Sequence, residues 1–364
     1  MVQMRTRGMF QIGISHLLAP LAAREKITIA AADIEGVLLE LKRSWELDEI
    51  VLVSTCSRFE IYGMAPDSDR ALESARGWFV SRAGAEIEPS LVAREGGEAL
   101  AHLFRVAAGL DSWIIGESEI LGQVKRAYET ARAAAVTGPT LNRSFQSALA
   151  AGKAARAQTA IQNGVHSIGG AAAMLARTIF GLRNDGAIVV FGAGDAAEAS
   201  VRHLSAKNFS RIFVANRTAD KAEALAARVG GTGVSFERGL DMLAETEIAV
   251  FSTASPVALL EPAALEEIMR RRGGRSLFLV DLGMPRNVNP ACAAMPGVFL
   301  YDLESLKDVV ARSVAGKSGE KEKAEGLVAI AAAACAAEID KAAAMRVPRK
   351  PAVAVERTLI LNPV

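Results

Sequence analysis

One cysteine, Cys56, stands in the polar segment STCSRFE, directly after the short apolar run 50–53. An apolar run of this length predicts a buried strand, so we expect the thiol where that strand ends. Arg58, two residues further on, would lower the pKa of the thiol and favour the nucleophilic thiolate. His102 is the candidate general base or orienting group for this cysteine. A lone cysteine is more often a small core residue, and that role is the alternative.

A second group of residues predicts a nucleotide site. The β-branched run 187–191 leads into a glycine turn and then into a helical pattern from Asp195. Strand, glycine turn and helix in this order bind a dinucleotide pyrophosphate at the helix N-terminus. The expected contacts are Gly192, Ala193, Gly194, Asp195, Ala196 and Ala197, the last at the third fingerprint position. A glycine turn in an α/β unit that binds no nucleotide is the alternative.

The end of the next strand indicates which nucleotide is bound. Strand 211–215 runs into Asn216, Arg217 and Thr218, without the acidic residue that an NAD site places there for the ribose 2′-hydroxyl. The planar guanidinium of Arg217 can pair with a 2′-phosphate instead. These residues predict NADPH as the cofactor, with a solvated surface role for Arg217 as the alternative.

Composition sets limits on the class of protein. The 364 residues predict two or three domains, and a formal net charge of +1 means that an RNA partner must be held by a local patch. The sequence contains neither an apolar run near 18 residues nor a signal-peptide pattern, so we expect a cytoplasmic protein without membrane contact. The three cysteines and four histidines are too scattered to predict a disulfide framework or a metal site.

The pattern along the chain predicts a multidomain α/β fold. We expect an N-terminal α/β catalytic domain over 1–155, a Rossmann-type NADP-binding domain over 156–301, and a helical region with a tail over 302–364. In the middle domain, strands alternate with helices, which implies a parallel sheet. Its predicted strands are 187–191, 211–215, 248–252 and 276–281. Helices are predicted from Gly97, from Ser118, over an Ala-rich region 141–180, and beyond Tyr301 with a charged interruption at 316–325.

Seven motifs, in order along the chain, resemble those of the glutamyl-tRNA reductase family. They are GISHLLAPLAARE, STCSRFEIYG, HLFRVAAGLDSWIIGESEILGQVKRAY over 102–128, GAGDAAEA, ANRT, STASP and DLGMPRNVNP. The block 102–128 is the most specific of them, and the resemblance covers residues 10–310.

The resemblance implies NADPH-dependent reduction of glutamyl-tRNA to glutamate-1-semialdehyde, with release of the tRNA, as the first step of five-carbon tetrapyrrole biosynthesis. Cys56 would form a thioester with the glutamyl group, and His102 matches a histidine important for activity. Arg58 would clamp the substrate carboxylate. The positions that match substrate contacts are Thr55, Ser57, Arg58, Ser112, Glu117, Ser118, Glu119 and Gln123. The resemblance further implies a homodimer, with 302–364 as a shortened helical dimerisation region and tail, and a downstream aminomutase partner.

Three departures from the family pattern leave alternatives open. Ser57 replaces an asparagine, Phe59 replaces a threonine, and Ser118-Glu119 replaces Pro-Gln. The first alternative is therefore a paralogue that reduces another aminoacyl-tRNA or thioester in a specialised pathway. A non-catalytic NADP-binding scaffold is the second. A shikimate-dehydrogenase-like enzyme is the third, and it leaves the block 102–128 unexplained.

Overall fold

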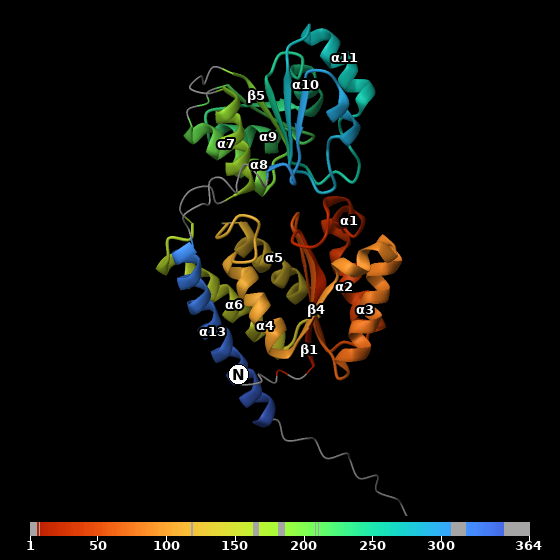
Figure 1. The fold of residues 1–364 in the computed structure, drawn as a ribbon, viewed down its shortest axis with the longest axis vertical. Coiled ribbons are helices and arrows are strands. Elements are labelled where there is room, and N and C mark those ends of the chain that lie inside the picture. The colour runs from red at the N-terminus through yellow and green to blue at the C-terminus, as the bar shows by residue number, and fades with distance from the viewer. Residues whose placement is uncertain are drawn as a thin grey trace, which may run out of the picture.

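The computed structural model describes residues 6, 8–117, 119–162, 167–180, 186–207, 209, 211–306 and 318–345. Two sheets lie one above the other, each with helices on both sides (Figure 1). The arrangement confirms the predicted fold class, with an N-terminal α/β domain, a Rossmann-type domain and a C-terminal helix.

The N-terminal domain is built on a four-stranded antiparallel sheet in the order β2-β3-β1-β4. Its strands are β1 (Met9–Ser15), β2 (Glu49–Ser54), β3 (Arg58–Met64) and β4 (Val92–Glu95). Helices α2 (Ile34–Ser44) and α3 (Ser68–Ala83) cover one face, and α4 (Gly96–Ala108), α5 (Glu119–Ala133) and α6 (Pro139–Gln158) cover the other (Figure 1). Helix α1 (Leu21–Lys26) lies at the end nearest the second domain. Short 3-10 turns span Ala31–Asp33 and Ala85–Ser90.

A carboxylate from the sheet caps one of these helices. Glu49, the first residue of β2, accepts the backbone N–H groups of Gly138, Thr140 and Leu141 at 2.9, 3.1 and 2.7 Å. The unsatisfied N–H groups and positive end of a helix favour a negative charge at this place. This contact fixes the N-terminus of α6 against the first residue of β2, the strand that leads to Cys56.

The second domain has a six-stranded parallel sheet in the order β10-β9-β8-β5-β6-β7. Its strands are β5 (Ile188–Phe191), β6 (Ile212–Asn216), β7 (Thr232–Ser235), β8 (Ile248–Phe251), β9 (Leu277–Asp281) and β10 (Val298–Tyr301). Its helices are α7 (Ile168–Phe180), α8 (Asp195–Ala206), α9 (Ala219–Ala227), α10 (Phe236–Met242) and α11 (Pro262–Arg272), with a 3-10 turn at Pro290–Ala294. Alternate residues of β5 enter opposite cores, Val190 packing with α7 and α8 and Val189 with α11.

The four strands predicted in this domain are confirmed, but β7 and β10 were not predicted. Both are short edge strands, and β7 (TGVS) carries no apolar run. The Ala-rich region 141–180 holds two helices, α6 and α7, with non-helical backbone described at 159–162 between them. The predicted interruption at 316–325 is wrong from Ser318 onward, because α13 (Ser318–Met345) runs through it.

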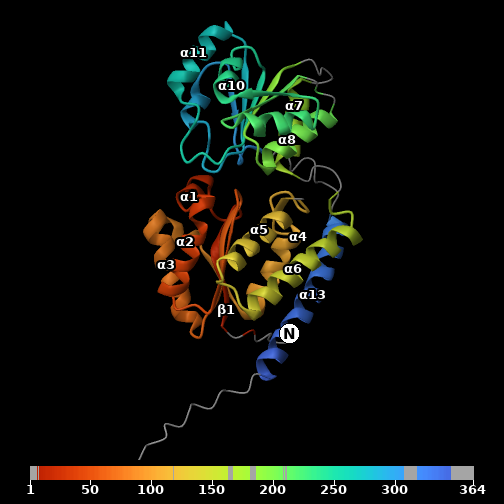
Figure 2. The ribbon, with the colours of Figure 1, turned by 180° about the vertical axis from the view of Figure 1, so that it is seen from behind.

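Helix α13 returns to the first domain and lies along α4 and α6 (Figure 2). Its inward side chains join the core of that domain: Ala324, Val328, Ala332, Cys335, Ala336 and Ile339. Small residues at helical spacing let the helix pack closely on the Ala-rich face of α6. The predicted tail from Arg346 lies outside the described residues. Of the helices described, none has the length and apolar character needed to cross a membrane.

Candidate active site

Cys56 lies at the tip of the hairpin between β2 and β3. The hydroxyl oxygen of Thr55 accepts the backbone N–H groups of Ser57 and Arg58, both at 3.2 Å, which is the pattern of a Ser/Thr turn. The N–H of His16 donates to the carbonyl of Ser57 at 2.8 Å. These bonds hold the turn, so the predicted placement of Cys56 at a strand end is confirmed.

The Cys56 side chain lies at the junction of the two domains. It packs, with Trp113 and Met284, against the apolar cluster of the nucleotide domain. Two residues of the first domain, Leu21 and Ile114, are buried in the same cluster. The candidate nucleophile therefore faces the domain that carries the predicted cofactor site.

The thiol is surrounded by more negative than positive charge. Burial, followed by the carboxylates of Glu117 and Glu119, raises the pKa of Cys56 to about 12, and Arg24 opposes this shift. The expectation that Arg58 lowers this pKa is wrong in this structure, because Arg58 belongs to a different cluster and Arg24 is the neighbouring cation. Thiolate formation at Cys56 therefore requires a proton acceptor or a change of environment when substrate binds.

Arg58 is the first residue of β3 and is only 1% exposed. Its Nη1 donates to the Glu60 carboxylate and its Nη2 to the Asp111 carbonyl, both at 2.7 Å. Its Nε is buried and has no hydrogen-bond partner among the described residues. One donor of a fully buried guanidinium is thus left for a ligand.

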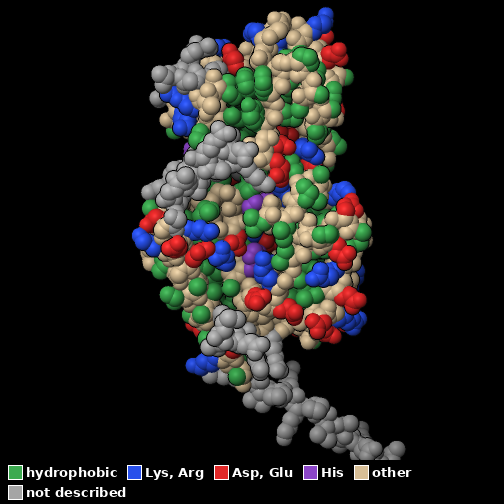
Figure 3. Space-filling model, viewed as in Figure 1, with side chains coloured by type: hydrophobic (Ala, Val, Ile, Leu, Met, Phe, Trp, Pro, Cys, Tyr) green, Lys and Arg blue, Asp and Glu red, His purple; other side chains and the backbone are tan. Residues whose placement is uncertain are grey.

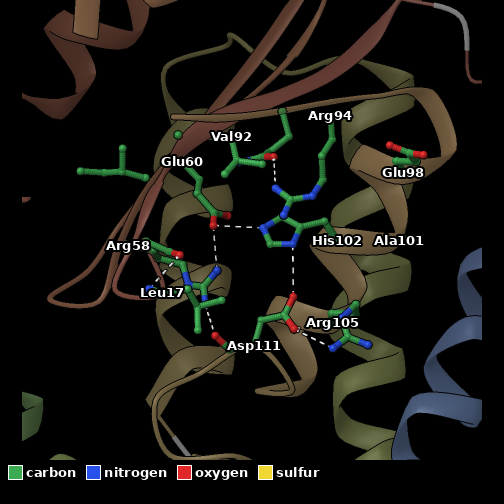
Figure 4. Close-up of a pocket in the computed structure, with 14 residues that line it drawn as sticks. Leu17, Arg58, Glu60, Val92, Arg94, Glu98, Ala101, His102, Arg105 and Asp111 are labelled. Carbon is green, nitrogen blue, oxygen red and sulfur yellow. Dashed lines mark hydrogen bonds and ion pairs between the residues drawn. The ribbon is translucent and has the colours of Figure 1, made fainter. Parts of the chain in front are cut away.

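His102 projects from α4 between two carboxylates (Figure 4). Its Nε2 lies 3.0 Å from Glu60 Oε1, and its Nδ1 lies 3.2 Å from Asp111 Oδ2. Burial would lower the pKa of His102, but these two neighbours outweigh it and raise it. Both nitrogens face carboxylates and neither bonds Cys56 in the described structure, so the geometry supports neither predicted role at the thiol. His102 instead links Glu60 to Asp111.

A cavity of about 420 Å³ opens beside this cluster. Its charged lining is Arg58, Glu60, Arg94, Glu98, His102, Arg105 and Asp111 (Figure 4). Figure 3 shows histidine, acidic and basic side chains gathered at the centre of the lower domain, on this face. Groups of both signs line one concave site, which suits a ligand that itself carries both charges.

The remaining predicted substrate contacts lie on or before α5. Glu117 is buried and its pKa is raised by burial, while Ser112, Arg58 and Arg156 oppose the shift. Burial and Glu117 together raise the pKa of Glu119 to about 7. Gln123 lies one turn further along α5 than Glu119. Ser118, the other predicted contact, lies outside the described residues.

The predicted glycine turn follows β5 and precedes α8. Gly192 has φ +110°, and a Cβ there would lie 2.1 Å from the Ser252 carbonyl oxygen, so only glycine fits. Gly194 caps α8 without a side-chain hydrogen bond, and a Cβ there would meet no protein atom within 4 Å. The exposed helix N-terminus and the open space beside Gly194 fit a pyrophosphate group.

The other predicted nucleotide contacts surround this turn. Asp195, Ala196 and Ala197 form the first turn of α8, and Asp195 pairs with Arg126 of α5 across the domain boundary. Asn216 ends β6, and its side chain donates to the Thr218 carbonyl at 3.3 Å. Arg217 and Thr218 are exposed. Arg217 is therefore available to a phosphate group.

Several site residues were not predicted from the sequence: Arg24, Glu25, Glu60 and Asp111, and also Arg94, Glu98 and Arg105 of the cavity lining. The alternation of β3 offers a signal for Glu60, because Arg58, Glu60 and Tyr62 share one face and Tyr62 donates to Glu60 at 2.7 Å. Arg24 and Glu25 contact residues more than 250 positions away, for which the local sequence holds no signal. Within the described ranges, no group of three His, Cys, Asp or Glu could hold a metal ion.

Comparison with known proteins finds matches over both domains. Residues 12–159 match the family model of the glutamyl-tRNA(Glu) reductase N-terminal domain, and residues 174–309 match that of shikimate / quinate 5-dehydrogenase. The chain is 39% identical over 320 residues to a glutamyl-tRNA reductase of Thermus thermophilus, covering 88% of this chain and 78% of that one. The chain belongs to the glutamyl-tRNA reductase family.

Other members of the glutamyl-tRNA reductase family give the same result. A relative from Syntrophotalea carbinolica is 37% identical over 320 residues, which is 87% of this chain and 72% of that one. The solved structure of the Methanopyrus kandleri glutamyl-tRNA reductase matches with a TM-score of 0.52 and 30% identity, over 92% of this chain and 81% of that one. Membership, together with the dehydrogenase-type domain, identifies an oxidoreductase that uses a pyridine nucleotide.

Proposed function

We propose that this protein transfers the glutamyl group of glutamyl-tRNA to Cys56 and reduces the thioester with NADPH. The products are glutamate-1-semialdehyde and free tRNA, the start of tetrapyrrole biosynthesis. The observation that carries the proposal is the position of Cys56, at a hairpin tip that packs against the nucleotide domain. A nucleophile in this position can take an acyl group and present it to a hydride donor.

The cavity beside His102 is the proposed site of the glutamyl group. The free Nε of Arg58 would donate to the side-chain carboxylate of the substrate, and burial strengthens such a charge-assisted bond. Glu60 and Asp111 hold Arg58 and His102 in place. Glu60 and Asp111 also keep the cavity from being purely cationic, which suits the ammonium group of an amino acid.

In the acyl transfer, the Cys56 sulfur attacks the ester carbonyl and the carbon–oxygen bond to the tRNA ribose breaks. The thiol proton passes to the ribose oxygen, which leaves as a hydroxyl group. Glu119 is the proposed carrier of this proton, because its pKa of about 7 lets it accept and release a proton near neutral pH. Our assignment gives His102 the task of orienting Glu60 and Asp111.

For the cofactor, the turn Gly192–Ala197 would hold the pyrophosphate and Arg217 the 2′-phosphate that distinguishes NADPH from NADH. When bound there, NADPH would supply the hydride for the thioester carbonyl. The carbon–sulfur bond then breaks, so the aldehyde is released and the Cys56 sulfur takes up a proton to return to the thiol. The chain's own contribution is to keep Cys56 against the nucleotide domain and partly shielded from water, which protects the thioester from hydrolysis.

A single-turnover experiment tests the function. Wild-type protein is mixed with glutamyl-tRNA labelled in the amino acid, with and without NADPH, beside a Cys56→Ser variant. We expect label on Cys56 without NADPH and labelled aldehyde with it, and neither product from Cys56→Ser. Absence of label on Cys56 in the wild type would contradict the proposal.

One observation favours a second candidate, a paralogue with another aminoacyl substrate. Glu119 places a carboxylate near Cys56, and a second negative charge disfavours a carboxylate substrate. The same assay with a panel of other aminoacyl-tRNAs separates the two candidates. Faster labelling of Cys56 by another aminoacyl-tRNA than by glutamyl-tRNA would establish the paralogue.

We also propose that the protein acts as a cytoplasmic homodimer that passes its aldehyde to an aminomutase. Helix α13 supports a dimer because it exposes Ile330 (72% exposed), together with Ala329, Ala333 and Ala337, on the side opposite the core. Light scattering of the wild type and of Ile330→Glu checks this, since the variant should be monomeric. A wild-type monomer would contradict it.

A further inference from the structure

The two domains are joined by charged side chains of the short helix α1. Leu21, Arg24 and Glu25 lie three and four positions apart, so they share one face of that helix. Leu21 is buried in the apolar cluster of the nucleotide domain. Arg24 and Glu25 both reach residues of the nucleotide domain as well.

The Glu25 contact uses three hydrogen bonds. Its carboxylate accepts the Arg286 backbone N–H at 2.8 Å, the Arg286 Nε at 2.9 Å and the Arg286 Nη2 at 2.7 Å. The two side chains are 16% and 26% exposed, so water screens this pair only in part. A bidentate Arg–carboxylate pair with an added backbone bond fixes the orientation of its partners as well as their distance.

The Arg24 contact joins the nucleotide domain to the reacting residue. Arg24 is 4% exposed, and its guanidinium donates to the backbone carbonyl of Cys56 and, at 2.7 Å, to Glu304 beyond β10. Leu303 and Leu306, on either side of Glu304, are buried in the apolar cluster of the nucleotide domain, so Glu304 belongs to that domain. Its Nε donates to the Ala19 carbonyl at 3.2 Å, which holds the side chain against its own domain. One buried cation thus bonds the Cys56 peptide and the nucleotide domain at once.

Arg286 lies in the loop that follows the carboxyl end of β9 in the nucleotide domain. Asp281 holds that loop by accepting the N–H groups of Gly283 and Val288 at 2.9 and 2.8 Å. In open parallel sheets, the nucleotide lies outside the carboxyl ends of the strands. Through Arg286, Glu25 therefore contacts the nucleotide domain at the carboxyl edge of its sheet, the edge that would carry the cofactor.

From these contacts we infer that Arg24 and Glu25 are positioning residues for the hydride step: they set where the nucleotide domain stands relative to Cys56. The inference rests on the proposed function. Neither residue need contact the substrate or the cofactor. Glu25 acts through Arg286, and Arg24 acts through the Cys56 carbonyl and Glu304. Acyl transfer requires only Cys56 and its own domain, so the two half-reactions should respond differently to loss of the Glu25–Arg286 pair.

The first test measures the contact without substrate or cofactor. Hydrogen–deuterium exchange of the Arg286 amide is compared in the wild type, in Glu25→Ala and in the control Glu86→Gln. The control removes another ion pair of α1, that of Lys26 with Glu86, which stays within one domain. We expect at least tenfold faster exchange in Glu25→Ala and no change in the control. An Arg286 amide that exchanges equally fast in wild type and Glu25→Ala would overturn the inference.

The second test separates the half-reactions. In Glu25→Ala and Arg286→Met, labelling of Cys56 by glutamyl-tRNA should stay within about twofold of the wild-type rate, while reduction at saturating NADPH should fall about tenfold or more. Arg286→Lys, which keeps one charged donor, should lose less than Arg286→Met. Equal loss of both half-reactions, or loss of neither, would overturn the positioning role.

The two proposals fail in distinguishable ways. A wild-type protein that never acquires label on Cys56 refutes the proposed function. The hydrogen–deuterium exchange measurement needs no substrate, so it still tests the contact between the domains in that case. A labelled wild type whose reduction step ignores Glu25 refutes only the positioning inference.

Discussion

Replacing Glu119 by glutamine should make Cys56 more reactive, and by an amount that depends on pH. The pKa of Cys56 is about 12, so about one thiol in ten thousand is ionised at pH 8. The pKa of Glu119 is about 7, which means that Glu119 is largely ionised at pH 9 and largely neutral at pH 6. Removing one like charge from a partly buried neighbour lowers a pKa by about one unit.

These values predict a distinctive profile for Glu119→Gln. Alkylation of Cys56 by iodoacetamide should be about tenfold faster than in the wild type at pH 9. At pH 6, where the wild-type carboxyl is already neutral, the two rates should agree within about 1.2-fold. Peptide mass spectrometry assigns the label to Cys56 and distinguishes it from the buried Cys292 and Cys335.

Glu129→Gln provides a matched control, because Glu129 is an exposed carboxylate on the same helix and pairs with Lys125. Its alkylation rates should match those of the wild type at every pH. A gain in Glu119→Gln that is equal at pH 6 and pH 9 would mean that the substitution loosened the turn around Cys56. That result, or no gain at all, would refute the electrostatic reasoning.

Three further outcomes are expected. Arg217→Ala should weaken the binding of NADPH about 10- to 100-fold, with little effect on the binding of NADH, as measured by fluorescence titration. Equal losses of affinity for the two nucleotides would contradict a contact between Arg217 and the 2′-phosphate. Gly194→Ala should keep the wild-type melting temperature and lose nucleotide binding, whereas Gly192→Ala should lose both, since its Cβ meets the Ser252 carbonyl. His102→Gln should lower the free energy of unfolding in urea by about 3 kcal/mol at pH 6 and by less at pH 9. Because the pKa of His102 is raised in the folded state, the charged imidazole stabilises the fold fully below the unfolded-state pKa near 6.5, and this stabilisation is lost as the pH rises through the folded-state pKa. A loss of stability that does not depend on pH would contradict a charged His102.

Local patterns predicted the four central strands of the nucleotide domain. Its strands are apolar runs followed by glycine or polar turns, and β5, β6, β8 and β9 all lie where those runs predict them. The turn at Gly192 has a positive φ that its residue type already indicated. The edge strand β7 (TGVS) was missed because a short strand with one neighbour needs little apolar surface. The other edge strand, β10 (VFLY), is an apolar run that was overlooked.

The candidate site was only partly predictable, because its charges come together through long-range packing. Cys56 and Arg58 would share a face if the strand continued, but the turn at Thr55 breaks the alternation. Arg58 therefore joins Glu60 and His102, and the cation beside Cys56 is Arg24 from a helix 32 positions earlier. Spacing within a motif carries no information about such a partner.

The return of α13 to the first domain has a consequence for the synthesis of the chain. The core of that domain includes Ala324, Val328 and Ile339, so it is incomplete until the ribosome has passed the whole nucleotide domain. At about 5–20 residues per second, the stretch from the end of α6 to the start of α13 takes roughly 8–32 s to translate. During that interval the Ala-rich face of α6 is bare, and the nucleotide domain can fold first. The proposed glutamyl site is thus completed last, although most of its residues are made first.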